Sequence, residues 1–132
     1  TTAAQLPPQA IIEPAAPHDR ITEEQIAVYQ SRVVLDIPNA TWARFTDTKS
    51  MEPVLYAGAN AIEVVPQSPG DVHVGDIISY SLNGISYIHR VMELGEDSDG
   101  WYAVMKGDNN QEADPFRVRF DQVQRIVVAI IY

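Results

Sequence analysis

Residues 77–92 read IISYSLNGISYIHRVM, two β-rich runs joined by an Asn-Gly pair. Asn-Gly between such runs is the strongest short-range signal for a β-hairpin, because a type I′ turn requires positive φ at both central residues. A two-residue turn also sets the register of the two strands. On its strand, His89 shares one face with Tyr87 and Val91, while Arg90 points to the other face. The predicted cross-strand pairs are Leu82 with Ile85, Tyr80 with Tyr87 and Ile78 with His89.

The chain outside this hairpin also consists mainly of short β-rich segments separated by Pro, Gly and Asn. Near the N-terminus, residues 22–25 (TEEQ) form a capping-box pattern, which predicts a short helix over residues 22–31. The expected fold class is therefore mostly β with a short N-terminal helix. Further strands are predicted over residues 33–37, 41–48, 61–65 and 76–82.

The chain divides into two parts by composition. Residues 1–20 are rich in Pro and Ala without periodicity, which is typical of a semi-extended linker or stalk. Residues 21–132 carry the β signal, and a chain of 132 residues that is 45% hydrophobic can bury the core of one domain. No apolar run approaches the roughly 18 to 20 residues that span a bilayer, and the N-terminus has no secretory signal pattern.

Charge and residue usage exclude several classes of function. The net charge is -9, from 18 acidic and 9 basic residues, so we expect no nucleic-acid partner and no extended surface for anionic lipid. The absence of cysteine excludes disulfides, thiolate zinc sites and a cysteine nucleophile. The three histidines lie far apart in the sequence, so we expect neither a metal site nor a cofactor.

Three short motifs occur in the order that a serine hydrolase needs. Ser50 begins the run SMEP, His89 lies in IHRV, and KGDNN (residues 106–110) is followed by Asp114. A serine hydroxyl becomes a nucleophile when a neighbouring base takes its proton, and an imidazole base needs a carboxylate that fixes its tautomer. The sequence therefore offers a nucleophile, a base and two candidate carboxylates. Each residue alone could equally be structural, Ser50 as a loop serine and His89 as a core histidine.

The three motifs resemble those of the type I signal peptidases, in particular the archaeal and endoplasmic-reticulum branch. That branch has a Ser-Met-x-Pro box, a histidine before Arg-Val where the bacterial branch has lysine, and a Gly-Asp-Asn-Asn box, and the similarity covers residues 46–132. It implies a signal-peptidase or SOS-repressor-like β fold and a serine endopeptidase that removes signal peptides from secretory preproteins. It also implies a membrane anchor outside this sequence and a catalytic domain on the extracytoplasmic face.

The resemblance assigns a role to each candidate residue. Ser50 is the nucleophile, His89 the general base, Asp114 the carboxylate that orients the imidazole, and Asp108 a supporting residue. The backbone N–H of Ser50 is one candidate donor to the oxyanion. The hydroxyl of Thr48, two positions before the nucleophile, is the second that the family implies. A structural role for Asp114, in a turn before a proline, stays open.

Other interpretations also stay open. A soluble autoprotease resembling the SOS repressors shares the Ser-Met-x-Pro box, although the histidine at the lysine position argues against it. A catalytically silent peptide-binding domain would share the fold. A lysine base is disfavoured, because Lys49 adjoins Ser50 and neighbouring side chains of an extended strand project to opposite faces.

Overall fold

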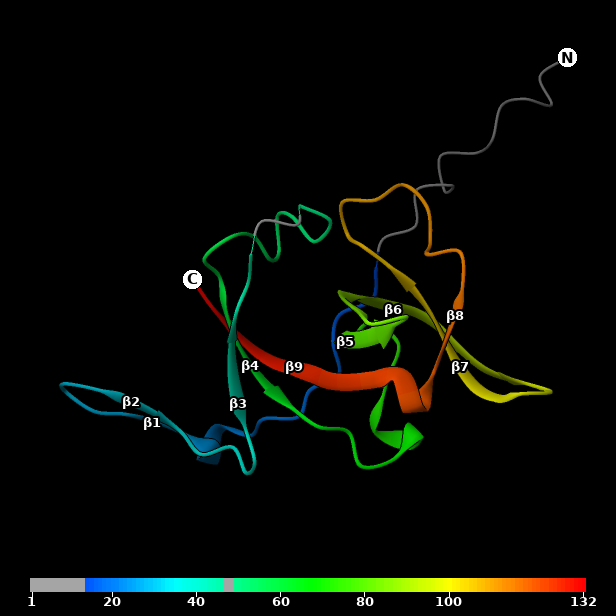
Figure 1. Cartoon of the computed structure of the whole chain (residues 1–132). Coiled ribbons are helices and arrows are strands. Elements are labelled where there is room, and N and C mark those ends of the chain that lie inside the picture. The colour runs from blue at the N-terminus through cyan, green and yellow to red at the C-terminus, as the bar shows by residue number, and fades with distance from the viewer. Residues whose placement is uncertain (1–13, 47–48) are drawn as a thin grey trace, which may run out of the picture.

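The main sheet contains seven antiparallel strands in the order β3-β4-β9-β5-β6-β7-β8 (Figure 1). The structure, a computed structural model, describes residues 14–46 and 49–132. The mostly β fold class is therefore as expected. The strands of this sheet are β3 (Thr41–Arg44), β4 (Asn60–Val64), β5 (Ile77–Leu82), β6 (Ile85–Asp97), β7 (Gly100–Lys106), β8 (Arg117–Arg119) and β9 (Val123–Ile131).

The central hairpin of the sheet, β5 and β6, has the predicted register. Its turn residues Asn83 and Gly84 both have positive φ, at 52° and 79°. The type of turn that the Asn-Gly pair requires is therefore present. The three predicted pairs are confirmed, Leu82 with Ile85, Tyr80 with Tyr87 and Ile78 with His89. Strand β6 continues beyond the hairpin and pairs with β7, so His89 lies in the interior of the sheet.

The remaining predicted strands are present in shortened form. Strand β2 (Val33–Leu35) replaces the predicted 33–37, β3 ends at Arg44, and β4 begins one residue early at Asn60. Residues 47 and 48, at the end of the predicted 41–48 strand, lie outside the described residues. Among residues 14–46 and 49–132, strand β3 pairs on one side only, with β4, so it forms an edge of the main sheet.

The predicted helix over residues 22–31 is wrong. A 3-10 turn, η3 (Glu23–Gln25), is followed directly by strand β1 (Ile26–Val28), which pairs with β2 in a separate hairpin (Figure 1). The capping contact exists, since the Gln25 side chain accepts a 2.9 Å hydrogen bond from the Thr22 backbone. However, Gln25 Nε2 also donates to the Asp36 carbonyl at 2.9 Å. The turn is therefore held by the chain that returns after β2, and the residues after Gln25 continue as a strand instead of a helix.

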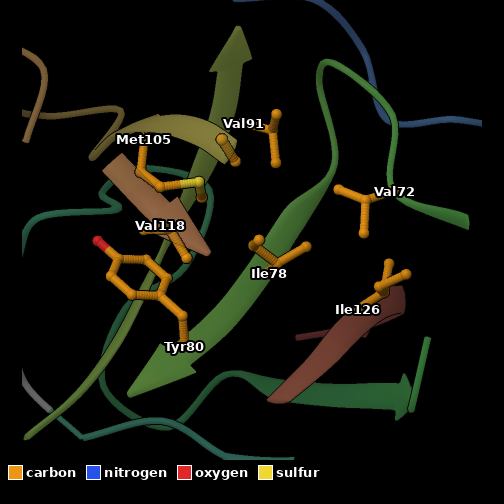
Figure 2. Packing of buried hydrophobic residues seen from close by; sticks show 8 residues of the cluster. Val72, Ile78, Tyr80, Val91, Met105, Val118 and Ile126 are labelled. Carbon is orange, nitrogen blue, oxygen red and sulfur yellow. The ribbon is translucent and has the colours of Figure 1, made fainter. Parts of the chain in front are cut away.

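Two apolar clusters form the core on either side of the hairpin. The first gathers buried side chains from β5, β6, β7, β8 and β9 (Figure 2). The second joins Met51 and Leu55, from the segment after Ser50, to Ala61, Ile77 and Val127 of the sheet. Met51 is 1% exposed, so burial of its side chain fixes the segment that carries Ser50. The labelled side chains of the first cluster are Val72, Ile78, Tyr80, Val91, Met105, Val118 and Ile126.

The segment before η3 contacts the domain through a buried aspartate. Asp76 is 1% exposed. It accepts a hydrogen bond from the His18 backbone N–H at 3.0 Å and forms an ion pair with Arg20. The His18 ring stacks on His73 with centroids 3.8 Å apart. These contacts join residues of the predicted linker to the loop before β5. Within the described ranges, no helix is long and apolar enough to cross a bilayer.

Candidate active site

Ser50 lies in a turn that follows β3 and is held from two sides. Met51 is buried in the second cluster, and Lys49 has a left-handed backbone with φ of 63°. From the opposite side, the Asn109 backbone N–H donates to the Ser50 carbonyl at 2.8 Å. The Asn109 side-chain amide also donates to the Lys49 carbonyl at 3.0 Å. The turn is therefore fixed both by burial and by hydrogen bonds.

Close packing against the serine turn explains why the Gly-Asp-Asn-Asn run begins with a glycine. A Cβ atom added to Gly107 would lie 2.7 Å from the Ser50 carbonyl oxygen, closer than real Cβ contacts come. The Asp108 backbone N–H also points at the Met51 sulfur, 3.4 Å away. The run therefore acts as a support against which the serine turn packs.

His89 links the serine to a carboxylate. Its Nε2 lies 3.1 Å from the Ser50 hydroxyl oxygen, and its Nδ1 lies 2.7 Å from Asp114 Oδ2. An Nδ1–H that donates to the carboxylate leaves the lone pair of Nε2 free to accept the Ser50 proton. The residue is 7% exposed and lies within β6, so the sheet limits its movement.

Asp114 is brought to His89 by the loop that follows β7. Its backbone N–H donates to the Met105 carbonyl at 2.7 Å, which ties the end of the loop to the strand it left. The Asp114 side chain is 10% exposed. A nearly buried carboxylate at this distance both orients the imidazole and stabilises the cation that forms when His89 takes a proton.

Asp108 contacts Arg90 instead of His89. The carboxylate accepts two hydrogen bonds from the guanidinium, at 2.9 Å from Nε and 2.8 Å from Nη2. Arg90 also donates to the Gly75 carbonyl at 2.9 Å and is 6% exposed. This paired geometry compensates the burial of both charges. Because successive residues of a strand face opposite sides, Asp108 supports the far face of β6.

Tyr80 is a member of the site that the motifs did not indicate. Its hydroxyl donates to Asp114 Oδ2 and lies 3.2 Å from His89 Nδ1. Burial and the hydrogen bond to Asp114 raise the pKa of Tyr80 well above its usual range, so the phenol keeps its proton. Figure 2 shows the ring within the first cluster and the hydroxyl directed away from Ile78. The hairpin register was the available signal, since it places Tyr80 diagonal to His89 on one face.

A cleft of about 350 Å³ opens beside Ser50 and His89. Phe45 and Thr46, which follow β3, line it on one side, and Tyr87 lines it from β6. A larger groove of about 520 Å³ lies between the N-terminal segment and β4. Neither Ser50, His89 nor Asp114 lines this groove. The cleft at Ser50 is therefore the space where a substrate would meet the nucleophile.

Thr48, the predicted second oxyanion donor, lies outside the described residues. Lys106, the lysine that begins the KGDNN run, donates from its ammonium group to the Gly107 carbonyl at 3.1 Å. In the part of the chain that the structure describes, no group of three or more His, Asp or Glu side chains could hold a metal ion.

Comparison with known proteins assigns neither a family nor a function to this site. No protein-family model matches the chain, and a search of curated proteins finds no match. Function is therefore inferred from the motifs and from the arrangement of Ser50, His89 and Asp114.

Proposed function

We propose that the protein is a serine endopeptidase of signal-peptidase type. The observation that carries this proposal is the hydrogen-bonded series from Ser50 through His89 to Asp114, at 3.1 and 2.7 Å, beside an open cleft. A nucleophile, a base within reach and a carboxylate that orients the base are the parts that acyl transfer requires.

The reaction proceeds through an acyl-enzyme. His89 Nε2 takes the proton of Ser50 as Oγ forms a bond to the scissile carbonyl carbon, and the carbonyl oxygen becomes an oxyanion. The imidazolium, stabilised by Asp114, then gives this proton to the departing amine as the C–N bond breaks. Water hydrolyses the ester by the same steps in reverse order, with His89 again acting as the base.

The backbone N–H of Ser50 suits the oxyanion. Among the described residues it donates to no backbone carbonyl, so it is available when negative charge develops on the substrate oxygen. A second donor from the Thr48 hydroxyl is part of the proposal that the family resemblance implies.

The edge strand β3 suits an extended peptide substrate. Its outer side has no partner strand among the described residues, so a peptide can add to the sheet by backbone hydrogen bonds. The expected partners are secretory preproteins whose signal peptides carry small residues before the cut. The expected location is the extracytoplasmic face of a membrane, with an anchor outside this sequence.

A serine-directed fluorophosphonate tests the nucleophile. We expect the protein to be labelled, and the Ser50→Ala and His89→Ala variants to lose labelling together with cleavage of a secretory preprotein. The matched control is Ser98→Ala, an exposed serine in the turn between β6 and β7, which should keep both. Labelling that survives Ser50→Ala would contradict the proposal.

The same samples separate the alternatives. Ser50-dependent cleavage of the chain itself, without cleavage of preproteins, would favour an autoprotease of SOS-repressor type. Absence of both labelling and cleavage, with peptide binding retained, would favour a catalytically silent peptide-binding domain.

A further inference from the structure

Glu63 is a buried carboxyl group that faces the same cleft as Ser50. It lies on β4, pairs with Thr41 of β3 and is 5% exposed, yet its side chain contributes to the cleft wall. Among the described residues, no side-chain hydrogen bond or ion pair reaches its carboxyl group. The acyl-transfer steps proposed for Ser50, His89 and Asp114 do not involve Glu63.

The carboxyl group of Glu63 faces the open cleft and is not a buried atom without a partner; among the described residues that condition applies to Arg20 Nε. Burial of the residue raises the pKa of Glu63, and the charge of Arg125 opposes this shift. A substrate that fills the cleft removes this carboxyl group from water, which costs free energy unless the substrate supplies a hydrogen-bond donor. A donor on the substrate is therefore favoured at this position.

The surroundings of Glu63 define the chemistry of that ligand. Ser79 and Gln124 add neutral polar groups to the cleft wall, and Arg44 and Arg125 add positive charge. A cationic side chain would meet two arginines, and an anionic one, even when paired with an arginine, would lie beside the Glu63 carboxylate without donating to it. An apolar side chain would leave the carboxyl group without a partner. A neutral side chain with a hydroxyl or amide donor suits the site best.

Strand pairing places Glu63 away from the nucleophile. Ala61 pairs with Ala43, and Glu63 pairs with Thr41, two residues further from Ser50 along the sheet. An extended peptide turns alternate side chains to one wall, about 6.6 Å apart. A peptide that follows β3 from Ser50 therefore reaches Glu63 with a residue that is not adjacent to the cut.

We propose that Glu63 forms a subsite that selects a neutral hydrogen-bond donor, Ser, Thr, Asn or Gln, at one substrate position remote from the scissile bond. This inference rests on the proposed peptidase function and adds a requirement on the substrate. A buried group built to pair with a donor discriminates against an isostere without one.

Isosteric peptides test the subsite. In a cleavable preprotein-derived peptide, each of the five positions on either side of the cut carries Thr or Val in turn. We expect kcat/KM for Thr to exceed that for Val by about tenfold or more at one position beyond the first, and by little elsewhere. Glu63→Leu should remove or reverse this preference, whereas Glu63→Gln, which keeps an acceptor of similar shape, should retain most of it. Glu24→Gln, at an exposed acid in η3, is the control for the lost charge.

Binding to the Ser50→Ala variant separates failure of the subsite from failure of the peptidase function. Titration calorimetry with the same Thr and Val peptides measures the preference without turnover. Cleavage with no preference at any position, or a preference that survives in Glu63→Leu, would overturn the subsite and leave the peptidase intact. A Thr preference in binding without any cleavage would support the subsite and contradict the peptidase. If peptides are neither cleaved nor bound, both proposals are wrong.

Discussion

Replacing Tyr80 by Phe removes one hydroxyl from the centre of the site and leaves the ring in place. Tyr80 is 0% exposed, and its ring packs against Tyr87 and Phe116, contacts that a phenylalanine keeps. The change therefore acts mainly on Asp114, whose Oδ2 then accepts only from His89 Nδ1 at 2.7 Å.

The magnitude follows from the loss of one hydrogen bond to a charged acceptor, about 1.5 to 3 kcal/mol of folding free energy. For a domain of this size, that corresponds to a lowering of Tm by roughly 5 to 10 °C. Asp114 also loses one of its two side-chain donors, so its carboxylate orients the imidazole less firmly. Any loss of transition-state stabilisation from this change should stay below about 1.4 kcal/mol, which is tenfold in kcat/KM.

The assay is peptide cleavage at a fixed pH, together with thermal unfolding. We expect kcat/KM of Tyr80→Phe to be lower than that of the wild type but within about tenfold of it, because Ser50, His89 and Asp114 remain. Tyr102→Phe, which removes a hydroxyl on β7, is the control for hydroxyl loss.

A change in stability alone would not support a role of the hydroxyl at Asp114. If Tyr80→Phe lowers Tm but leaves kcat/KM at the wild-type value, the hydroxyl contributes to packing and does not position Asp114. An unchanged Tm together with an unchanged kcat/KM would refute the hydrogen bond as a contribution to the site.

Further predictions concern the four acidic groups with defined environments. Asp114→Asn should keep the fold but lower kcat by as much as roughly ten-thousandfold, because the amide favours the wrong imidazole tautomer. Asp108→Asn should instead cost about 3 kcal/mol of stability in urea unfolding and less than about tenfold in turnover; the reverse pattern would exchange the two roles. Burial raises the pKa of Glu63, so the wild type loses stability as pH rises above the ordinary range of a carboxyl group, and the free energy of unfolding of Glu63→Gln should gain on that of the wild type as pH rises above about 4. Hydrogen bonds from Arg119 and Arg117 hold the pKa of Asp97 well below its usual range. The stability that these bonds add is therefore present above about pH 4 and lost as pH falls, and Asp97→Asn should lack this part of the acid sensitivity.

Local chemistry in the sequence was sufficient for the central hairpin and for two members of the site. The Asn-Gly turn determines the register of β5 and β6 through backbone conformation alone, so the strand position of His89 follows without knowledge of the rest of the fold. The order of the motifs marked Ser50 and His89 as partners. The capping contact predicted at residues 22–25 is present, but the helix predicted from it was wrong, because strand pairing with residues 33–35 is not local.

The tertiary structure decided between the two aspartates on physical grounds. The family resemblance assigned Asp114 to His89, but Asp108 and Asp114 lie in one loop, and the chemistry of a carboxylate does not distinguish them. Opposite faces of β6 do, since His89 and Arg90 project to different sides of the sheet and each receives one carboxylate. The roles of Tyr80 and Glu63 also followed only from the tertiary structure. A hydrogen bond needs two atoms within about 3 Å, and for residues distant in the sequence that distance is set by the folding of the whole chain.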